Sequence, residues 1–276
     1  MTKLKLMIAK LVKYLTEDRS DRHLEDGNSA YKNGDFTSAF KKLKASAENG
    51  NVIAQYNIAN MFSKGEGVTQ DHAKAAGWYR LAAEQGDELA QLNIGSSYEH
   101  GEGVEKDDAE AIKWYLLSAE NGNLNAQFNA GLMFNKGRGV TQDYVQAVYW
   151  YRLASEQGNL EATNNLASMT KKGLGVSQDN FEAVRLYKIA ADKGLPYAQN
   201  NLATMYIDGL GVKQDLFEAV RLFKLAAEQG NVDAQINLAE MYEVGHGTEI
   251  NDAEAQRWYR IAAEQGNEEA KNKIKA

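Results

Sequence analysis

The sequence predicts an all-α fold, a right-handed α-α superhelical solenoid built from helix pairs. The first observation is a 36-residue period, in which the segment 82–87 (AAEQGD) returns as 118–123 (SAENGN) and three more times further along the chain. The second is an alanine-rich composition with 24 glycines and one proline, which favours helices punctuated by glycine. Repeats of this length stack in an open array instead of closing around one core.

Each 36-residue unit is predicted to hold two helices. In the unit that begins at Asn51, Asn51 and Asp71 are placed to cap the two helices, because each side chain can accept hydrogen bonds from free backbone N–H groups. Gly65 and Gly67 suit a turn that needs positive φ, and Gly86 suits a left-handed end to the second helix. The unit at Leu195 lacks a polar cap but has Pro196 at its first helical position.

Three residues after the second-helix cap, five of the six units carry Glu or Gln, which predicts a capping box. These residues are Glu110, Gln146, Glu182, Glu218 and Glu254. Small residues recur where helices approach, at Ala59, Gly95, Gly131, Ala167, Ala203 and Ala239, opposite large ones at Tyr79, Tyr115, Tyr151, Tyr187, Phe223 and Tyr259. Alternation of this kind predicts interdigitated helix layers.

The pattern divides the chain into four parts. Residues 51–266 hold six 36-residue repeats, and residues 267–276 begin a further one as a C-terminal cap. Residues 19–50 lack the Gly-x-Gly loop, but Gly27, Ala39 and Leu43 have a spacing that resembles a tetratricopeptide repeat, so this segment is expected to be an N-terminal cap repeat. Residues 1–18 contain an amphipathic helix, with apolar residues at three-four spacing and lysines off that face. This helix is expected to cap the first repeat, while membrane-surface contact through residues 3–15 and partner binding stay open as alternatives.

These residues resemble the Sel-one-like repeat (SLR) family, a relative of the tetratricopeptide repeats. The shared pattern runs Ala…Leu-Gly…Tyr…Gly-x-Gly-Val…Asp…Ala…Trp-Tyr…Ala-Ala-Glu-Gln-Gly-Asn and extends over residues 51–266. The resemblance implies a binding module, since the family is known for assembling complexes, including in bacterial signalling and host contact.

Catalysis, metals and cofactors are not predicted. The four histidines show no metal-ligand spacing, and the two Ser-x-x-Lys motifs at Ser38 and Ser168 lack the accompanying motifs of a serine–lysine enzyme. The chain has no cysteine and carries a net charge of −7. Residues 1–44 hold ten Lys/Arg and six Asp/Glu, so the remainder is strongly acidic. An acidic array argues against nucleic acid as a partner.

Positions that stay the same between units build the stack, whereas positions that vary can recognise a partner. The asparagine column at Asn57, Asn93, Asn129, Asn165, Asn201 and Asn237 is predicted to hold neighbouring units in register, with a peptide-backbone clamp as the alternative. The positions that vary between repeats predict a concave groove that is apolar in its N-terminal half and polar in its middle. Its partner-binding residues are Ile53, Tyr56, Leu89, Leu92, Phe128, Leu132, Asn164, Lys171, Lys172 and Asn200. Completion of inter-unit packing by Tyr56 and Phe128 is the competing interpretation.

The predicted function is therefore a scaffold or adaptor that binds a peptide or protein in the concave groove. The alternative is a dedicated inhibitor, such as an immunity protein that blocks a toxin or effector, an occupation of some similar proteins. No stretch approaches the roughly 20 apolar residues of a membrane span, and the lysines at positions 10 and 13 interrupt any signal-peptide core, so a cytoplasmic location is expected. The identity of the partner and the oligomeric state do not follow from the sequence.

Overall fold

The structure, a computed structural model, describes residues 20–274, and all regular structure in that range is helical, with no strand. The predicted helix within residues 1–18 lies outside this range. The chain divides between Gln142 and Asp143 into two compact units. No helix among the described residues is both long enough and apolar enough to cross a membrane.

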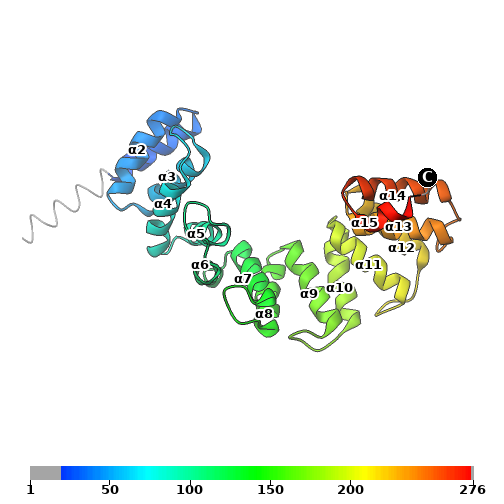
Figure 1. Ribbon diagram of the computed structural model, residues 1–276. Helices are drawn as coiled ribbons and strands as arrows, with labels where there is room; N and C mark the ends of the chain where they lie inside the picture. The colour runs from blue at the N-terminus through cyan, green and yellow to red at the C-terminus, as the bar shows by residue number, and fades with distance from the viewer. Residues whose placement is uncertain (1–19, 275–276) are drawn as a thin grey trace, which may run out of the picture. The chain divides into compact units, whose positions relative to one another are not determined.

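In the first unit, a helix over residues 20–32 is followed by six more. These are α2 (Phe36–Glu48), α3 (Val52–Lys64), α4 (His72–Glu84), α5 (Glu88–His100), α6 (Asp108–Glu120) and α7 (Leu124–Lys136). Consecutive helices pack on one another along the unit (Figure 1). The odd-numbered helices α3, α5 and α7 are the first helices of their repeats.

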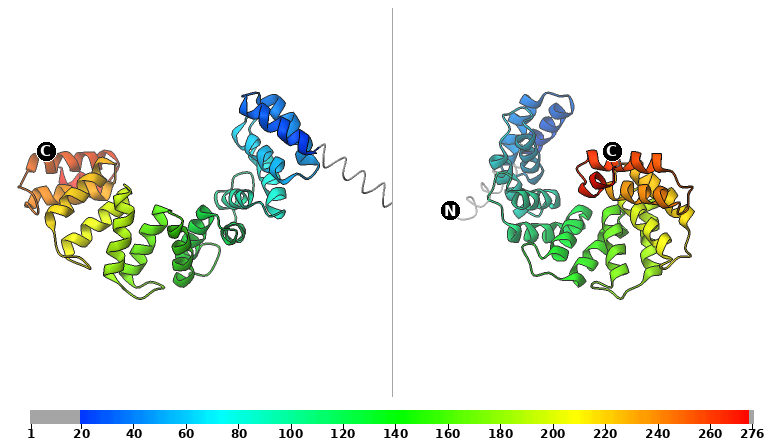
Figure 2. Two further views of the ribbon diagram at one scale, coloured as in Figure 1. Left: turned by 180° about the vertical axis from the view of Figure 1, so that it is seen from behind. Right: turned by 45° about the vertical axis from the view of Figure 1, so that its right-hand side comes forward.

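The second unit begins with α8, which is the second helix of its repeat, and first and second helices then alternate along the unit (Figure 2). Its helices are α8 (Tyr144–Glu156), α9 (Leu160–Lys172), α10 (Asn180–Asp192), α11 (Pro196–Asp208), α12 (Leu216–Glu228), α13 (Val232–Val244), α14 (Asp252–Glu264) and α15 (Glu268–Lys273). The short α15 packs on α14, where the Gln256 side chain donates to the backbone oxygen of Lys273.

The helix caps confirm the predicted boundaries. Asn51 accepts from the backbone N–H of Ala54, and Asp71 accepts from that of Lys74. Gly65 ends α3 in the left-handed conformation, at φ 72° and ψ 31°. At the exception, Leu195 makes no side-chain cap and Pro196 starts the helix, as predicted.

The capping-box prediction is only half right. The N-cap half is confirmed, because Asp179 accepts from the backbone N–H of Glu182. The reciprocal half is wrong, because the backbone N–H of Asp179 donates to the oxygen of Thr170 in the preceding helix. With that donor already satisfied, the Glu182 carboxylate pairs with Arg185 at 2.7 Å instead.

The second glycine of each Gly-x-Gly loop has a role that the turn chemistry did not predict. A Cβ atom at Gly139 would overlap the backbone carbonyl of Asp108, and one at Gly211 would overlap that of Asn180. The same clash with the start of the previous repeat's second helix recurs at Gly67, Gly103, Gly175 and Gly247. Each repeat therefore contacts its predecessor backbone to backbone, and glycine is required there for space as well as for positive φ.

The predicted small–large packing is confirmed by the tyrosine column. Tyr115 is buried, and its ring lies so close to Gly95 that a Cβ atom there would come within 2.8 Å of it. Tyr151, Tyr259 and Phe223 are likewise buried at the equivalent position. At Tyr115, the aromatic side chain fills the core between α5 and α6, the two helices of its repeat.

Candidate functional site

The predicted apolar groove residues all lie on α3, α5 and α7, in the first unit. We call their shared surface the first-helix face, defined by Ile53, Tyr56, Leu89, Leu92, Phe128 and Leu132. Ile53 and Leu89 are 54% and 41% exposed, although both are large and apolar. The others are half-buried. Large apolar side chains left open to water on neighbouring helices are typical of protein-binding surfaces.

Tyr56 takes part in packing as well as lining this face. Its ring centroid lies 6.0 Å from that of Tyr79, and its side chain packs against the buried core of the first repeats. Both rings belong to the repeat that begins at Asn51, so the competing interpretation, in which Tyr56 and Phe128 complete packing between units, stays open. Ile53 and Leu89 are the more exposed members of the face.

The predicted polar residues lie in the second unit and behave differently. The Asn164 side-chain oxygen accepts from Asn201 at 2.9 Å, and that of Asn200 accepts from Asn237 at 2.9 Å. Asn57 makes a similar bond to Asn28 in the first unit. The predicted register role of the asparagine column is confirmed at these three junctions. Lys171 is half-buried and Lys172 exposed at the end of α9.

A buried glutamine ladder provides a second set of links. Gln55 donates to the oxygen of Ala47, at the end of the preceding second helix, and accepts from Gln85 at the end of its own repeat's second helix. Gln199 and Gln235 repeat both bonds in the second unit. These side chains connect consecutive second helices, which explains why the glutamine recurs along the chain.

Charged side chains cluster at one junction on the first unit. The Arg138 guanidinium, from the loop after α7, donates to Glu99 at 2.8 Å and to Asp108 at 2.7 Å, both in the preceding repeat. Glu99 also accepts from the buried Tyr115 hydroxyl at 2.6 Å. Burial, together with this hydrogen bond, raises the pKa of Tyr115, so the hydroxyl stays a donor. The hydrogen bond from Arg138 lowers the pKa of the Asp108 carboxyl.

We expect Arg138→Ala to destabilise the protein at pH 7 by about 1–2 kcal/mol, the value of a partly exposed hydrogen-bonded ion pair. Because the folded-state pKa of Asp108 is depressed, its contribution is present above the ordinary carboxyl pKa and is lost as the pH falls through the folded pKa. Urea unfolding at pH 7 and near pH 3 measures the difference from the wild type. That difference should shrink at the lower pH, whereas an equal loss at both would contradict the charge pairing. Lys113→Ala, which removes the exposed pair with Glu110, is the control.

Sequence comparison along the first helices missed an exposed apolar edge in the second unit. It consists of the second residues of α8, α10 and α12, namely Val145, Phe181 and Phe217. Phe181 and Phe217 are each 77% exposed. The sequence does indicate this edge, because the second position of the second helix changes from small to large apolar residues along the chain. The residues at this position are Ala73, Ala109, Val145, Phe181, Phe217 and Ala253.

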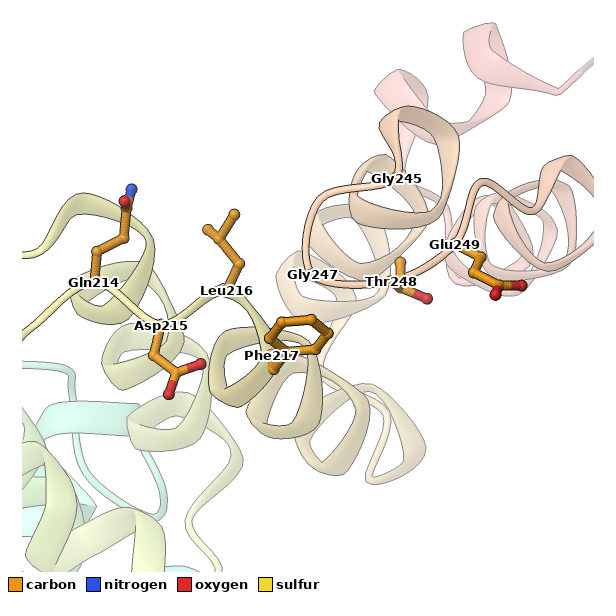
Figure 3. A pocket seen from close by; sticks show the side chains of 8 residues that line it. All are labelled: Gln214, Asp215, Leu216, Phe217, Gly245, Gly247, Thr248 and Glu249. Atoms are coloured by element: carbon orange, nitrogen blue, oxygen red, sulfur yellow. The ribbon is translucent and has the colours of Figure 1, made fainter.

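Phe217 borders a pocket of about 730 Å³. The pocket lies between the start of α12 and the loop that contains Gly245, Gly247 and Thr248 (Figure 3). Phe217 lies beside that loop, and Asp215 and Glu249 add carboxylates to the lining. At Phe217, the edge thus combines an exposed aromatic ring with negative charge.

Among residues 20–274, no group of three or more His, Asp or Glu side chains is placed to hold a metal ion. The prediction that the chain is not an enzyme stays a prediction. The described surfaces offer apolar contacts and hydrogen-bonding groups, which are suited to recognition.

The repeats match a known family. Six consecutive segments fit the Sel1 repeat, at residues 52–87, 89–123, 124–159, 160–195, 196–231 and 232–267. The chain belongs to the Sel1 repeat family. Sel1 repeat solenoids are typically scaffolds for protein interactions and are generally not enzymes.

Solved Sel1 repeat proteins share the architecture. The chain is 38% identical to a protective antigen of uropathogenic Escherichia coli strains with an SLR fold, with a TM-score of 0.82 over 95% of this chain and 57% of that one. It thus spans little more than half of that relative. A Sel1 repeat protein from Oxalobacter formigenes is 34% identical, with a TM-score of 0.78 over 87% of this chain and 96% of its own. These similarities confirm the predicted solenoid of SLR helix pairs. No curated protein matches the chain.

Proposed function

We propose that this Sel1 repeat protein is an interaction scaffold that binds a peptide or protein segment on the first-helix face of its first unit. The observation that carries the proposal is the exposure of Ile53 and Leu89 at the same position of α3 and α5. Later repeats have Asn125, Glu161, Tyr197 and Asp233 at this position, so the repeat architecture does not require an apolar residue there.

The surrounding side chains support binding of an extended segment. Tyr56, Leu92, Phe128 and Leu132 are half-buried, and such residues offer contact area with little conformational entropy to lose. Neighbouring first helices present these contacts at a regular spacing, on the order of 10 Å. A segment that runs across the helices can therefore place successive apolar side chains against successive repeats.

The test is affinity capture from a lysate of the source organism, followed by measurement of Kd with the purified partner. We expect Ile53→Ser combined with Leu89→Ser to raise Kd at least tenfold, since loss of apolar anchors commonly removes 1 kcal/mol or more each. Both positions are exposed, so the variant should keep the helical circular dichroism of the wild type.

Val145→Ser combined with Phe181→Ser is the matched control, because it removes two apolar side chains from the second unit that are even more exposed. It should change Kd less than twofold. If the control abolishes binding and the α3–α5 variant does not, the partner binds the second unit and the proposal is wrong. A single partner held at nanomolar Kd, with a toxin activity that the chain blocks, would indicate the predicted alternative of a dedicated inhibitor.

A further inference from the structure

A small polar pocket lies beside the first-helix face, at the start of the first unit. It has a volume of about 230 Å³ and lies between the helix of residues 20–32 and α3, with Leu43 of α2 at its base. Its polar lining consists of Asn28, Tyr31, Lys32, Asn57, Asn60 and Lys64. The lining therefore contains two ammonium groups and three amides but no carboxylate.

Hydrogen bonds inside the pocket leave donors available. Asn57 donates to the side-chain oxygen of Asn28 at 3.0 Å, and the Tyr79 hydroxyl donates to that of Asn60 at 2.6 Å. Each oxygen accepts one bond, whereas the NH₂ groups of Asn28 and Asn60 have no acceptor among the described residues and can donate to a ligand. An amide NH₂ group can only donate, so the pocket suits an acceptor.

The charges around the pocket favour an anion. Lys32 and Lys64 are exposed, and within residues 20–274 neither has a carboxylate oxygen within 4.0 Å. The adjacent Glu66 carboxylate accepts from the Tyr31 hydroxyl at 2.6 Å.

The repeat pattern shows that this lining is not an architectural requirement. The pair Asn-x-x-x-Lys stands at Asn28–Lys32 and again at Asn60–Lys64, in two successive first helices. The later first helices replace it with Ser96–His100, Leu132–Lys136, Ser168–Lys172, Thr204–Asp208 and Glu240–Val244. Two copies of one donor pair therefore face a shared pocket at one end of the chain only.

We propose that this pocket binds the carboxylate of an Asp or Glu side chain in the partner segment. The ammonium groups of Lys32 and Lys64 attract the carboxylate, and the NH₂ groups of Asn28 and Asn60 donate to its oxygens. The pocket volume is below that of most small-molecule sites, and a pocket of this size suits a single side chain. This inference rests on the proposed function and adds the chemistry that the partner must offer, an acidic residue next to its apolar ones.

The test uses the full chain and a rhodamine-labelled, end-capped tetraglutamate peptide, with tetraglutamine as the matched probe. Fluorescence anisotropy at low salt should show tetraglutamate binding at least tenfold more tightly. Lys32→Gln combined with Lys64→Gln should weaken tetraglutamate binding at least tenfold. Lys41→Gln combined with Lys136→Gln makes the same change in net charge at exposed lysines outside the pocket and should change Kd less than twofold.

A second readout locates the contact. The side-chain NH₂ signals of Asn28 and Asn60 in nitrogen-proton NMR spectra, assigned by their loss in Asn28→Ser and Asn60→Ser, should shift on titration with tetraglutamate. Equal weakening by the two double lysine variants, unmoved NH₂ signals, or tighter competition by inorganic phosphate than by acetate would each overturn the proposal.

The two proposals fail separately. If the purified partner loses affinity through Ile53→Ser with Leu89→Ser but not through Lys32→Gln with Lys64→Gln, the scaffold function stands and the acidic-residue site does not. If neither double variant weakens partner binding, the first-helix face is not the binding surface.

Discussion

Gly211→Ala is expected to destabilise the second unit by about 2–5 kcal/mol. A left-handed conformation costs a non-glycine residue about 1–2 kcal/mol, and Gly211 has φ 67°. The added Cβ would also overlap the carbonyl of Asn180, and overpacking of this kind typically costs a further 1–3 kcal/mol. Since the obstacle is backbone in the preceding repeat, no side-chain rotation relieves it. Urea unfolding followed by circular dichroism measures the loss.

Gly230→Ala separates the two causes. Gly230 has φ 88°, but a Cβ there would meet no atom within 4 Å. Its substitution should cost only the conformational part, about 1–2 kcal/mol. Equal shifts of the urea midpoint in the two variants would show that the close approach between repeats contributes nothing.

Gln235→Leu is expected to cost about 2 kcal/mol, although the two side chains are similar in size. Gln235 is 1% exposed, donates to the oxygen of Ala227 at 3.2 Å, and accepts from Gln265 at 2.9 Å. Leucine removes both bonds across the junction of α12, α13 and α14, in a place that water does not reach. Thermal unfolding by calorimetry measures the change.

The control for this ladder is Gln265→Leu. Gln265 is exposed, so its substitution removes the outer hydrogen bond while its own polar groups can turn to water. We expect a loss below about 0.5 kcal/mol. A loss as large as that of Gln235→Leu would mean that the outer bond, and not the buried link to Ala227, stabilises the junction.

Helix boundaries were predictable because they depend on local chemistry that recurs at each repeat. Asn51, Asp71 and Gly65 fix their helix ends through bonds and dihedral angles within a few residues. The reciprocal capping box failed at Glu182 because a competing acceptor, the Thr170 oxygen, comes from a different helix. Local motifs do not reveal such tertiary competition.

The candidate site was predictable only in part, for a similar reason. The position of Ile53 and Leu89 varies between repeats, whereas positions that pack the helices keep the same kind of residue. This variation allowed the exposure of Ile53 and Leu89 to be predicted. The pocket at Asn28 and Asn60 depends on how two successive helices approach, and the period alone does not fix that geometry. The edge at Phe181 was missed because only the first helices were compared.

The glycine–carbonyl contact has a consequence for how such a gene can change. The contact of Gly67 with the start of α2 is made again by the second loop glycine of every later repeat with its own predecessor. An in-frame duplication or deletion of 36 codons, starting anywhere within residues 51–266, therefore recreates the same contact on both sides of the altered segment. A duplication whose length is not a multiple of 36 codons would shift this register and place a side chain where only glycine fits. The number of repeats is thus free to vary in descendants of the gene, and changes that begin after Lys64 leave the single Asn–Lys pocket intact.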